Sequence, residues 1–191
     1  MAGKIVLISG PCGAGKTTIS RLMVQNTDAP KAVHMHTDDF YTYIQKGYIP
    51  PWQDGSGDQN DTVIRAAAAC AETYAEGDYD VYVDGVIGPW FIAAWQDLVR
   101  KGVDVRYVVL RPDRDETVRR GLEREARAEF PLTEQVFTDM WEMFRDLGAF
   151  SVYAMNTGSQ TAAESAACLK ARLQNGEFRL SAFGEESEDG M

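Results

Sequence analysis

An octapeptide near the start of the chain constrains the fold more than any other feature: Gly10-Pro11-Cys12-Gly13-Ala14-Gly15-Lys16-Thr17. It has the G-x-x-x-x-G-K-[ST] spacing of a phosphate-binding P-loop. The apolar run before it predicts a buried strand, and apolar residues at helical spacing follow it. A P-loop needs this setting, because its glycines let the backbone wrap an anion and the helix N-terminus attracts negative charge. We therefore expect nucleotide binding; the alternative is an ordinary glycine-rich turn.

Particular residues of this segment have expected roles in binding ATP and Mg²⁺. Lys16 is expected to reach the β- and γ-phosphates, and the hydroxyl of Thr17 to bind the metal ion. The ATP-binding residues expected here are Gly10, Pro11, Cys12, Gly13, Ala14, Gly15, Lys16, Thr17 and Thr18. The second expected metal ligand is Asp84, which ends the apolar run Val81-Tyr82-Val83. The alternative is that Asp84 only caps the end of a strand.

Apolar, β-rich runs alternate with helical patterns, which indicates a parallel sheet covered by helices on both faces. The expected strands are residues 5–9, 32–37, 79–84, 103–110 and 150–155. The expected helices are residues 15–26, 61–76, 89–101, 113–128, 133–147 and 160–174. The segment 40–59 has no simple assignment. The length suits one α/β domain, placed at residues 1–176, followed at 177–191 by an acidic tail that is expected to be disordered.

Composition disfavours some partners and compartments. The formal net charge is −10, whereas binding to a nucleic-acid backbone needs clustered lysine and arginine. No apolar run is long enough to span a bilayer, and the N-terminus does not resemble a signal peptide. Three cysteines without a C-x-x-C pair are typical of a reducing compartment. We expect a cytoplasmic monomer or homodimer that binds neither nucleic acid nor membrane.

The end of the second expected strand carries two adjacent carboxylates, Asp38 and Asp39. Open α/β sheets place ligands at the carboxyl ends of their strands, where a carboxylate can accept the proton of an attacking hydroxyl. We expect Asp38 to be this general base and Asp39 to lie nearer the metal or to cap a helix. The alternative is that both are turn residues.

The residues around these carboxylates predict the chemistry of the acceptor. Asp38, Asp39, Tyr41, Tyr48 and Trp52 are the expected acceptor-binding residues. The only lysine and arginine between His36 and Val99 are Lys46 and Arg65, whereas aspartates also occur at 54, 58 and 61. Anionic acceptors are usually held by arginine. The expected acceptor is therefore a neutral or cationic hydroxylated molecule, such as a nucleoside, an antibiotic or an amino sugar; the alternative buries these aromatic rings in the core.

An arginine-rich segment at about residues 111–130 is expected to form a lid. Arg120, Arg124 and Arg127 lie at i, i+4 and i+7 and so share one helical face. Phosphoryl transfer requires neutralisation of the charge on the migrating group. We expect Arg120 and Arg124 to act in transfer and Arg127 to bind ATP. Glutamates interspersed among the arginines support the alternative of a salt-bridged surface helix.

Residues 1 to about 176 resemble a P-loop small-molecule kinase of the adenylate-kinase-like superfamily. The resemblance depends on features that occur in the same order along the chain: the P-loop unit, the aspartate of the second strand, Asp84 and the arginine-rich segment. The run Asp38-Asp39-Phe40-Tyr41 is similar to the D-x-F-Y segment of uridine kinases, in which the first aspartate is the base. A version of the same position occurs in chloramphenicol phosphotransferase. The resemblance implies a three-layer P-loop NTPase fold with a five-stranded parallel sheet of order 2-3-1-4-5. It also implies that the loop after the last strand, here Asn156-Thr157-Gly158, helps to bind adenine.

The reaction that these features predict is transfer of the γ-phosphate of ATP, with Mg²⁺, to a hydroxyl of a small molecule. Two alternatives remain: a nucleotide-binding regulatory protein without transfer activity, and a kinase acting on polynucleotide ends, which the acidic charge disfavours. Other P-loop classes fit worse. The sequence has no N-K-x-D motif for guanine and no L-S-G-G-Q transporter signature, and it is short for an AAA+ motor.

Overall fold

In the computed structural model, which describes residues 2–126 and 132–182, five strands form one parallel sheet of order β2-β3-β1-β4-β5. The strands are β1 (Ile5–Ser9), β2 (Ala32–His36), β3 (Asp80–Asp84), β4 (Val105–Leu110) and β5 (Ala154–Met155). Every residue of the central strand β1 is buried, as a strand covered on both faces requires. The predicted P-loop NTPase fold and strand order are confirmed.

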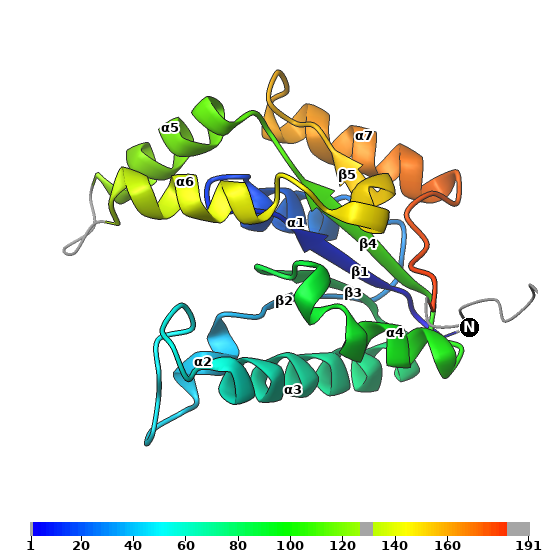
Figure 1. Ribbon diagram of the computed structural model, residues 1–191. Helices are drawn as coiled ribbons and strands as arrows, with labels where there is room; N and C mark the ends of the chain where they lie inside the picture. The colour runs from blue at the N-terminus through cyan, green and yellow to red at the C-terminus, as the bar shows by residue number, and fades with distance from the viewer. Residues whose placement is uncertain (1, 127–131, 183–191) are drawn as a thin grey trace, which may run out of the picture.

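Helices cover both faces of this sheet (Figure 1). They are α1 (Lys16–Gln25), α2 (Asp39–Thr42), α3 (Gly57–Glu76), α4 (Ala93–Arg100), α5 (Arg114–Glu125), α6 (Glu134–Met143) and α7 (Ala162–Gln174). Helices α3 and α4 lie on one face, and α1 and α7 lie on the other. Helices α5 and α6 pack on each other beyond the carboxyl ends of the strands. None of the helices in residues 2–126 and 132–182 is long and apolar enough to cross a membrane.

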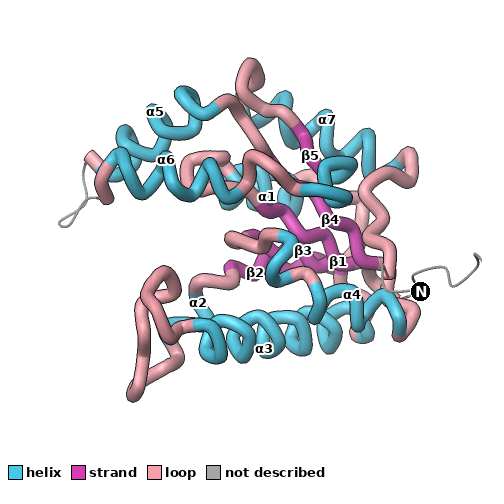
Figure 2. Tube along the Cα trace, in the orientation of Figure 1, coloured by secondary structure: helices cyan, strands magenta, loops and turns pink. Residues whose placement is uncertain are grey.

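The long loop between α2 and α3, residues 43–56, lies on the same side of the molecule as the α5–α6 pair (Figure 2). Part of the segment that had no assignment is helical, because α3 begins at Gly57, four residues before the expected start. The side chain of Gln59 holds the loop against α3 by bonding to the backbone of Ile49: the Ile49 N–H donates to Gln59 Oε1 at 2.8 Å, and Gln59 Nε2 donates to the Ile49 carbonyl at 2.6 Å. The loop is therefore attached to the helix that follows it.

The last strand is shorter than expected. Residues 148–153 form a 3-10 helix, and only Ala154 and Met155 pair with β4. The aromatic residues in this segment fit the pattern of a strand, but the ring of Tyr153 packs against Tyr107, with ring centroids 5.4 Å apart. Tertiary packing thus uses the aromatic side chains without needing an extended backbone.

The packed chain continues past residue 176, where the sequence placed the domain boundary. Phe178 and Leu180 are buried, and Arg179 forms an antiparallel bridge with Arg106 of β4. The Leu180 N–H donates to the Val105 carbonyl at 2.9 Å. Because β5 is so short, this segment covers the edge of β4 that would otherwise be unpaired. The described residues after 176 thus pack on the domain instead of forming the expected tail, and residues 183–191 lie outside the described residues.

Gly121 determines how closely α5 approaches α6. A Cβ at this position would lie 2.5 Å from the ring of Phe137, which is fully buried on α6. We predict that Gly121→Ala lowers the free energy of unfolding by about 1–3 kcal/mol, the usual cost of overpacking. Urea denaturation followed by circular dichroism measures this change. Gly57→Ala is the control, because its Cβ would meet no atom within 4 Å; equal unfolding free energies for the two variants would contradict this role of Gly121.

Candidate functional site

The P-loop connects β1 to α1 in a conformation that depends on glycine. Gly10, Gly13 and Gly15 have φ angles of 140°, 88° and 89°. A Cβ at Gly13 would lie 2.3 Å from the carbonyl oxygen of Thr117 on α5. Backbone conformation and close packing therefore both require glycine at this position. The loop is fixed against α5, the helix that carries the arginines.

Lys16 folds back over the P-loop. Its Nζ donates hydrogen bonds to the carbonyl oxygens of Gly10, at 2.9 Å, and Pro11, at 3.0 Å. Burial lowers the pKa of Lys16, whereas the nearby Cys12, Asp38 and Asp84 act in the opposite direction. The ammonium group is thus held beside the loop that would bind phosphate.

The side chain of Asp84, at the end of β3, is fully buried and is the centre of a hydrogen-bond network. Thr17 Oγ1 donates to Asp84 Oδ2 at 2.5 Å, His34 Nε2 lies 2.6 Å from Oδ1, and His36 Nδ1 lies 3.1 Å from Oδ2. Burial by itself would raise the pKa of Asp84. The hydrogen bonds from His34, His36 and Thr17 outweigh burial and hold that pKa below its ordinary value. The structure thus brings together Thr17 and Asp84, the two expected metal ligands.

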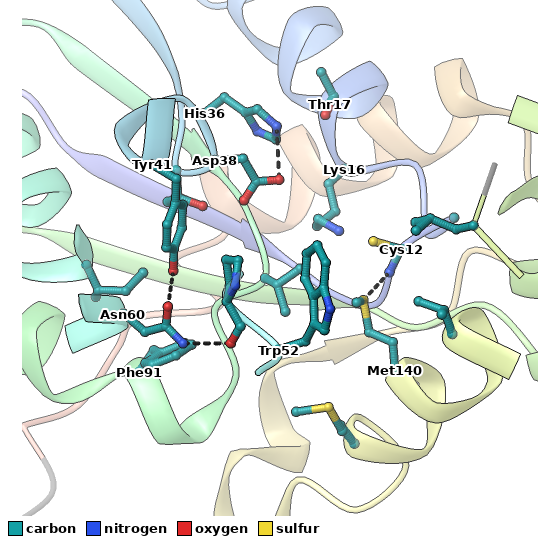
Figure 3. Close-up of a pocket in the computed structure, with 18 of the residues that line it drawn as sticks. Cys12, Lys16, Thr17, His36, Asp38, Tyr41, Trp52, Asn60, Phe91 and Met140 are labelled. Carbon is teal, nitrogen blue, oxygen red and sulfur yellow. Dashed lines mark hydrogen bonds and ion pairs between the residues drawn. The ribbon is translucent and has the colours of Figure 1, made fainter. Parts of the chain in front are cut away.

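His36 connects this buried carboxylate with Asp38. Its Nε2 lies 3.4 Å from Asp38 Oδ2 (Figure 3), and its other ring nitrogen, Nδ1, is the one that contacts Asp84. The hydrogen bond with Asp84 raises the pKa of His36. Neither histidine had an expected role. Their i, i+2 spacing places both on one face of β2, beside β3, but the spacing alone could not identify the carboxylate that they share.

A cavity of about 1510 Å³ lies against the P-loop, beyond the carboxyl ends of the strands. It is larger than the roughly 300–1,000 Å³ that is typical of a site for one small ligand, so a nucleotide and an acceptor can occupy it together. The expected site residues that line it are Cys12, Gly13, Gly15, Lys16, Thr17, Thr18, Asp38, Tyr41, Tyr48, Trp52, Arg120 and Arg124. In Figure 3, side chains from separate elements, among them Lys16, Asp38 and Trp52, surround this cavity.

Several expected site residues do not line the cavity. Asp39 is the exposed first residue of α2 and is absent from the lining. Successive helical side chains point about 100° apart, which separates Asp39 from the cavity-lining Asp38. Residues 156–158 are also absent from the lining, although Arg120 Nη2 donates to the Thr157 carbonyl at 3.4 Å. Arg127 lies outside the described residues.

Helix α5 has features of both alternatives for the arginine-rich segment, which were arginines that act on phosphate and a salt-bridged surface helix. Arg119 pairs with Glu116 at 2.8 Å and with Glu123 at 2.5 Å on the surface of the helix. Arg120 and Arg124 line the cavity, and Arg120 is held by Glu116 at 2.6 Å. The helix is therefore salt-bridged, and two of its arginines also line the cavity.

Two further residues that line the cavity were not expected there. Arg21 lines it from α1 and has no ion pair in the part of the chain that the structure describes. Asn60 of α3 accepts a hydrogen bond from the Tyr41 hydroxyl at 3.0 Å. Burial, aided by the charge of Asp38, raises the pKa of Tyr41 to about 12, so this phenol is a neutral donor at physiological pH. Arg21 adds positive charge to the cavity, and Asn60 fixes Tyr41 in its wall.

The donor atoms at Thr17 and Asp84 fit a magnesium ion. A hydroxyl and a carboxylate are hard oxygen donors, the type that Mg²⁺ prefers, usually together with phosphate oxygens and water. In residues 2–126 and 132–182, no group of three or more His, Cys, Asp or Glu side chains is placed to hold a metal ion. A magnesium ion here would therefore depend on a bound nucleotide for further ligands.

Comparisons with known proteins agree with this architecture. The model of a family described as AAA domain matches residues 6–130. The tunicamycin resistance protein of Deinococcus radiodurans has a TM-score of 0.64 and 17% identity, covering 90% of this chain and 95% of its own. The APS kinase of Mycobacterium tuberculosis, solved in complex with AMPPNP and APS, has a TM-score of 0.66 and 18% identity. The match covers 91% of this chain and 98% of the kinase. A gluconokinase from Sinorhizobium meliloti has a TM-score of 0.57 and 17% identity, and the match covers 92% of this chain and 98% of the gluconokinase. These identities show the fold alone, and no curated protein matches by sequence.

The network around Asp84 predicts a particular dependence of stability on pH. The lowered pKa of Asp84 stabilises the fold above its ordinary value of 3.8, and this contribution is lost as the pH falls through the folded-state pKa. The raised pKa of His36 stabilises the fold below its ordinary value of 6.5, and this contribution is lost as the pH rises through the folded-state pKa. The unfolding free energy lost in Asp84→Asn should therefore be largest between these two ordinary values. Urea denaturation at acidic, intermediate and alkaline pH measures it.

The control for this experiment is Asp39→Asn, because Asp39 is exposed and outside the network. It should change stability little at any pH. A loss in Asp84→Asn that is the same at all three pH values would show that charge at Asp84 does not stabilise the network.

Proposed function

The chain belongs to the family described as AAA domain, and on that basis we propose that it is an ATP-dependent phosphotransferase acting on a hydroxyl of a small neutral or cationic molecule. The main support is that Lys16, Asp38 and two arginines of α5 line one cavity. The matched residues, 6–130, include the P-loop, Asp38 and Asp84. The shared fold with an APS kinase and a gluconokinase supports the same reaction class.

The phosphate end of the cavity would hold ATP. The amides of the P-loop and the N-terminus of α1 attract the triphosphate, and Lys16 adds a positive charge beside them. Thr17 and Asp84 would hold Mg²⁺, which when bound neutralises phosphate charge. Arg120 and Arg124, which line the cavity, would stabilise charge on the migrating phosphoryl group.

Asp38 is the proposed general base. Its side chain is 61% exposed and lines the same cavity as Lys16. The acceptor oxygen would attack the γ-phosphorus, the bond from that phosphorus to the β–γ bridging oxygen would break, and ADP would leave. The hydroxyl proton would pass to the Asp38 carboxylate. His36, between Asp38 and Asp84, would orient the base.

One assay tests the reaction class against its alternatives. ATP turnover is measured alone and with nucleosides, aminoglycosides, sugars, and short DNA or RNA carrying a 5′-hydroxyl. Stimulation by a small hydroxylated compound supports the proposal, and stimulation only by polynucleotides favours the end-kinase alternative. ATP binding without stimulation by any member would favour the regulatory alternative.

Lys16→Ala should abolish tight ATP·Mg²⁺ binding or turnover, because it removes the positive charge beside the β- and γ-phosphates. Isothermal titration with a nonhydrolysable ATP analogue measures the affinity. Lys46→Ala is the matched control, since Lys46 is exposed and outside the cavity lining. Unchanged affinity together with unchanged turnover in Lys16→Ala would contradict the P-loop assignment.

Asp38→Asn should lower the rate of transfer by roughly 10²–10⁴-fold, the usual loss for a general base. The substitution is nearly isosteric, so nucleotide affinity should change little. Steady-state kinetics with an accepted alcohol measure the rate, and Asp39→Asn is the control. A large loss in Asp39→Asn with a mild effect of Asp38→Asn would reverse the roles of the two residues.

A further inference from the structure

The cationic and the apolar side chains that line the cavity come from different elements. Its lysine and arginines, four residues in all, come from the P-loop, α1 and α5. A second set comes from the α2–α3 loop, the segment after β3 and α6, and we call it the apolar wall: Tyr48, Trp52, Trp90, Phe91, Met140 and Met143. Within the described residues, the elements of the apolar wall contribute no lysine, arginine or carboxylate to the lining.

The aspartates that suggested a cationic acceptor lie elsewhere. Asp38 is the only carboxylate among the described residues that line the cavity. Asp39, Asp54, Asp58 and Asp61 are exposed and absent from the lining, and Asp61 pairs with Arg65 at 3.1 Å. A cationic group against the apolar wall would therefore find no carboxylate partner there.

Polar groups next to the apolar wall are largely bonded to the protein itself. The Tyr41 hydroxyl donates to Asn60 Oδ1 at 3.0 Å. Asn60 Nδ2 donates to the Pro51 carbonyl at 2.8 Å and to Ser56 Oγ at 3.1 Å. These bonds hold the loop that carries Trp52 against α3, and they use both protons of the Asn60 amide. Apart from Gln53, which also lines the cavity from this loop, a ligand at the wall would meet mainly carbon and sulfur.

Large parts of the apolar wall are open to solvent. Trp52 is 77% exposed and Met143 is 52% exposed. Contiguous exposed apolar surface beside a cavity is typical of ligand-binding grooves, and methionine side chains adapt to ligands of irregular shape. Met140 also connects the wall to the phosphate end, because its Sδ accepts a hydrogen bond from the Cys12 N–H at 3.2 Å (Figure 3).

We propose that the acceptor is an uncharged alcohol whose body is flat and largely apolar or aromatic, and that it binds between Asp38 and the apolar wall. This proposal rests on the proposed phosphotransferase function and narrows its acceptor class. The occupant is a small molecule because the wall is continuous with the cavity that holds Lys16 and Asp38. An anionic group on the body of the acceptor would lose water without gaining a partner, and a cationic group would meet ring faces but no carboxylate at the wall.

The test uses three alcohols that differ in one substituent on the phenyl ring. They are 3-phenylpropane-1,2-diol and its derivatives that carry an aminomethyl or a carboxyl group at the para position of the ring. Near neutral pH they are uncharged, cationic and anionic. Binding to the full chain with AMPPNP and Mg²⁺ is measured by saturation-transfer NMR, which detects millimolar affinities. We expect the uncharged diol to bind at least about tenfold more tightly than either charged derivative, because only it avoids an unpaired charge at the wall.

Two variants locate the binding surface. Trp52→Ala should weaken binding of the uncharged diol at least about fivefold, since truncation of a contacting aromatic side chain commonly has such an effect. Tyr43→Ala is the matched control, because Tyr43 is 71% exposed on the same loop but does not line the cavity. AMPPNP affinity should be unchanged in both variants, which also shows that they are folded.

Three outcomes would overturn the proposal. They are tighter binding of a charged derivative than of the uncharged diol, no saturation transfer to the uncharged diol, and equal affinity of Trp52→Ala and the wild type for that diol. If sedimentation shows that Trp52→Ala abolishes a dimer without affecting the diol, the apolar wall is an interface between copies of the chain.

The experiments can contradict the proposed acceptor class and the proposed phosphotransferase reaction separately. Binding is measured with AMPPNP and does not depend on catalysis, whereas transfer from ATP is followed by ³¹P NMR across the same alcohols and the compounds of the turnover assay. Binding of the uncharged diol without transfer to any compound would contradict the phosphotransferase function alone. Preferred transfer to a charged alcohol would contradict the acceptor class alone.

Discussion

The buried carboxylate of Asp84 is the interaction on which the geometry of the site depends. It accepts a hydrogen bond from Thr17 at the start of α1 and contacts both histidines of β2, so it joins three elements at the carboxyl end of the sheet. An unpaired carboxylate could not be buried there without a large penalty. The three partners satisfy it, and through His36 they connect the expected metal site with Asp38.

The P-loop and the two helices beyond the sheet form a second connected unit. Gly13 packs against the backbone of α5, Gly121 of α5 packs against Phe137 of α6, and the Cys12 N–H donates to Met140. The phosphate-binding loop, the arginines and the methionines of the apolar wall are therefore coupled by direct contacts. A change in the spacing of α5 and α6 would alter both ends of the cavity.

Because these elements differ in composition, the basic and the apolar side chains of the cavity lining come from different parts of the chain. The P-loop, α1 and α5 contribute the positive charge of the lining, and the apolar wall contributes aromatic rings and thioethers. Asp38 lies at the end of β2 and is the one carboxylate in the described lining. This division suits a reaction that brings a highly charged donor to an acceptor with little charge of its own.

The sequence by itself determined the P-loop, the parallel sheet covered by helices and the pairing of Asp84 with Thr17, because each depends on local spacing or on the alternation of strands and helices. The strand order was implied only by the resemblance to P-loop kinases. It could not determine the partners of His34 and His36, the separation of Asp38 from Asp39, or the packing of Phe178 and Leu180 on β4. It also could not show that the aspartates near Trp52 face away from the cavity. These features were decided by tertiary structure, because they depend on which side chains from distant segments meet and on the direction in which each one points.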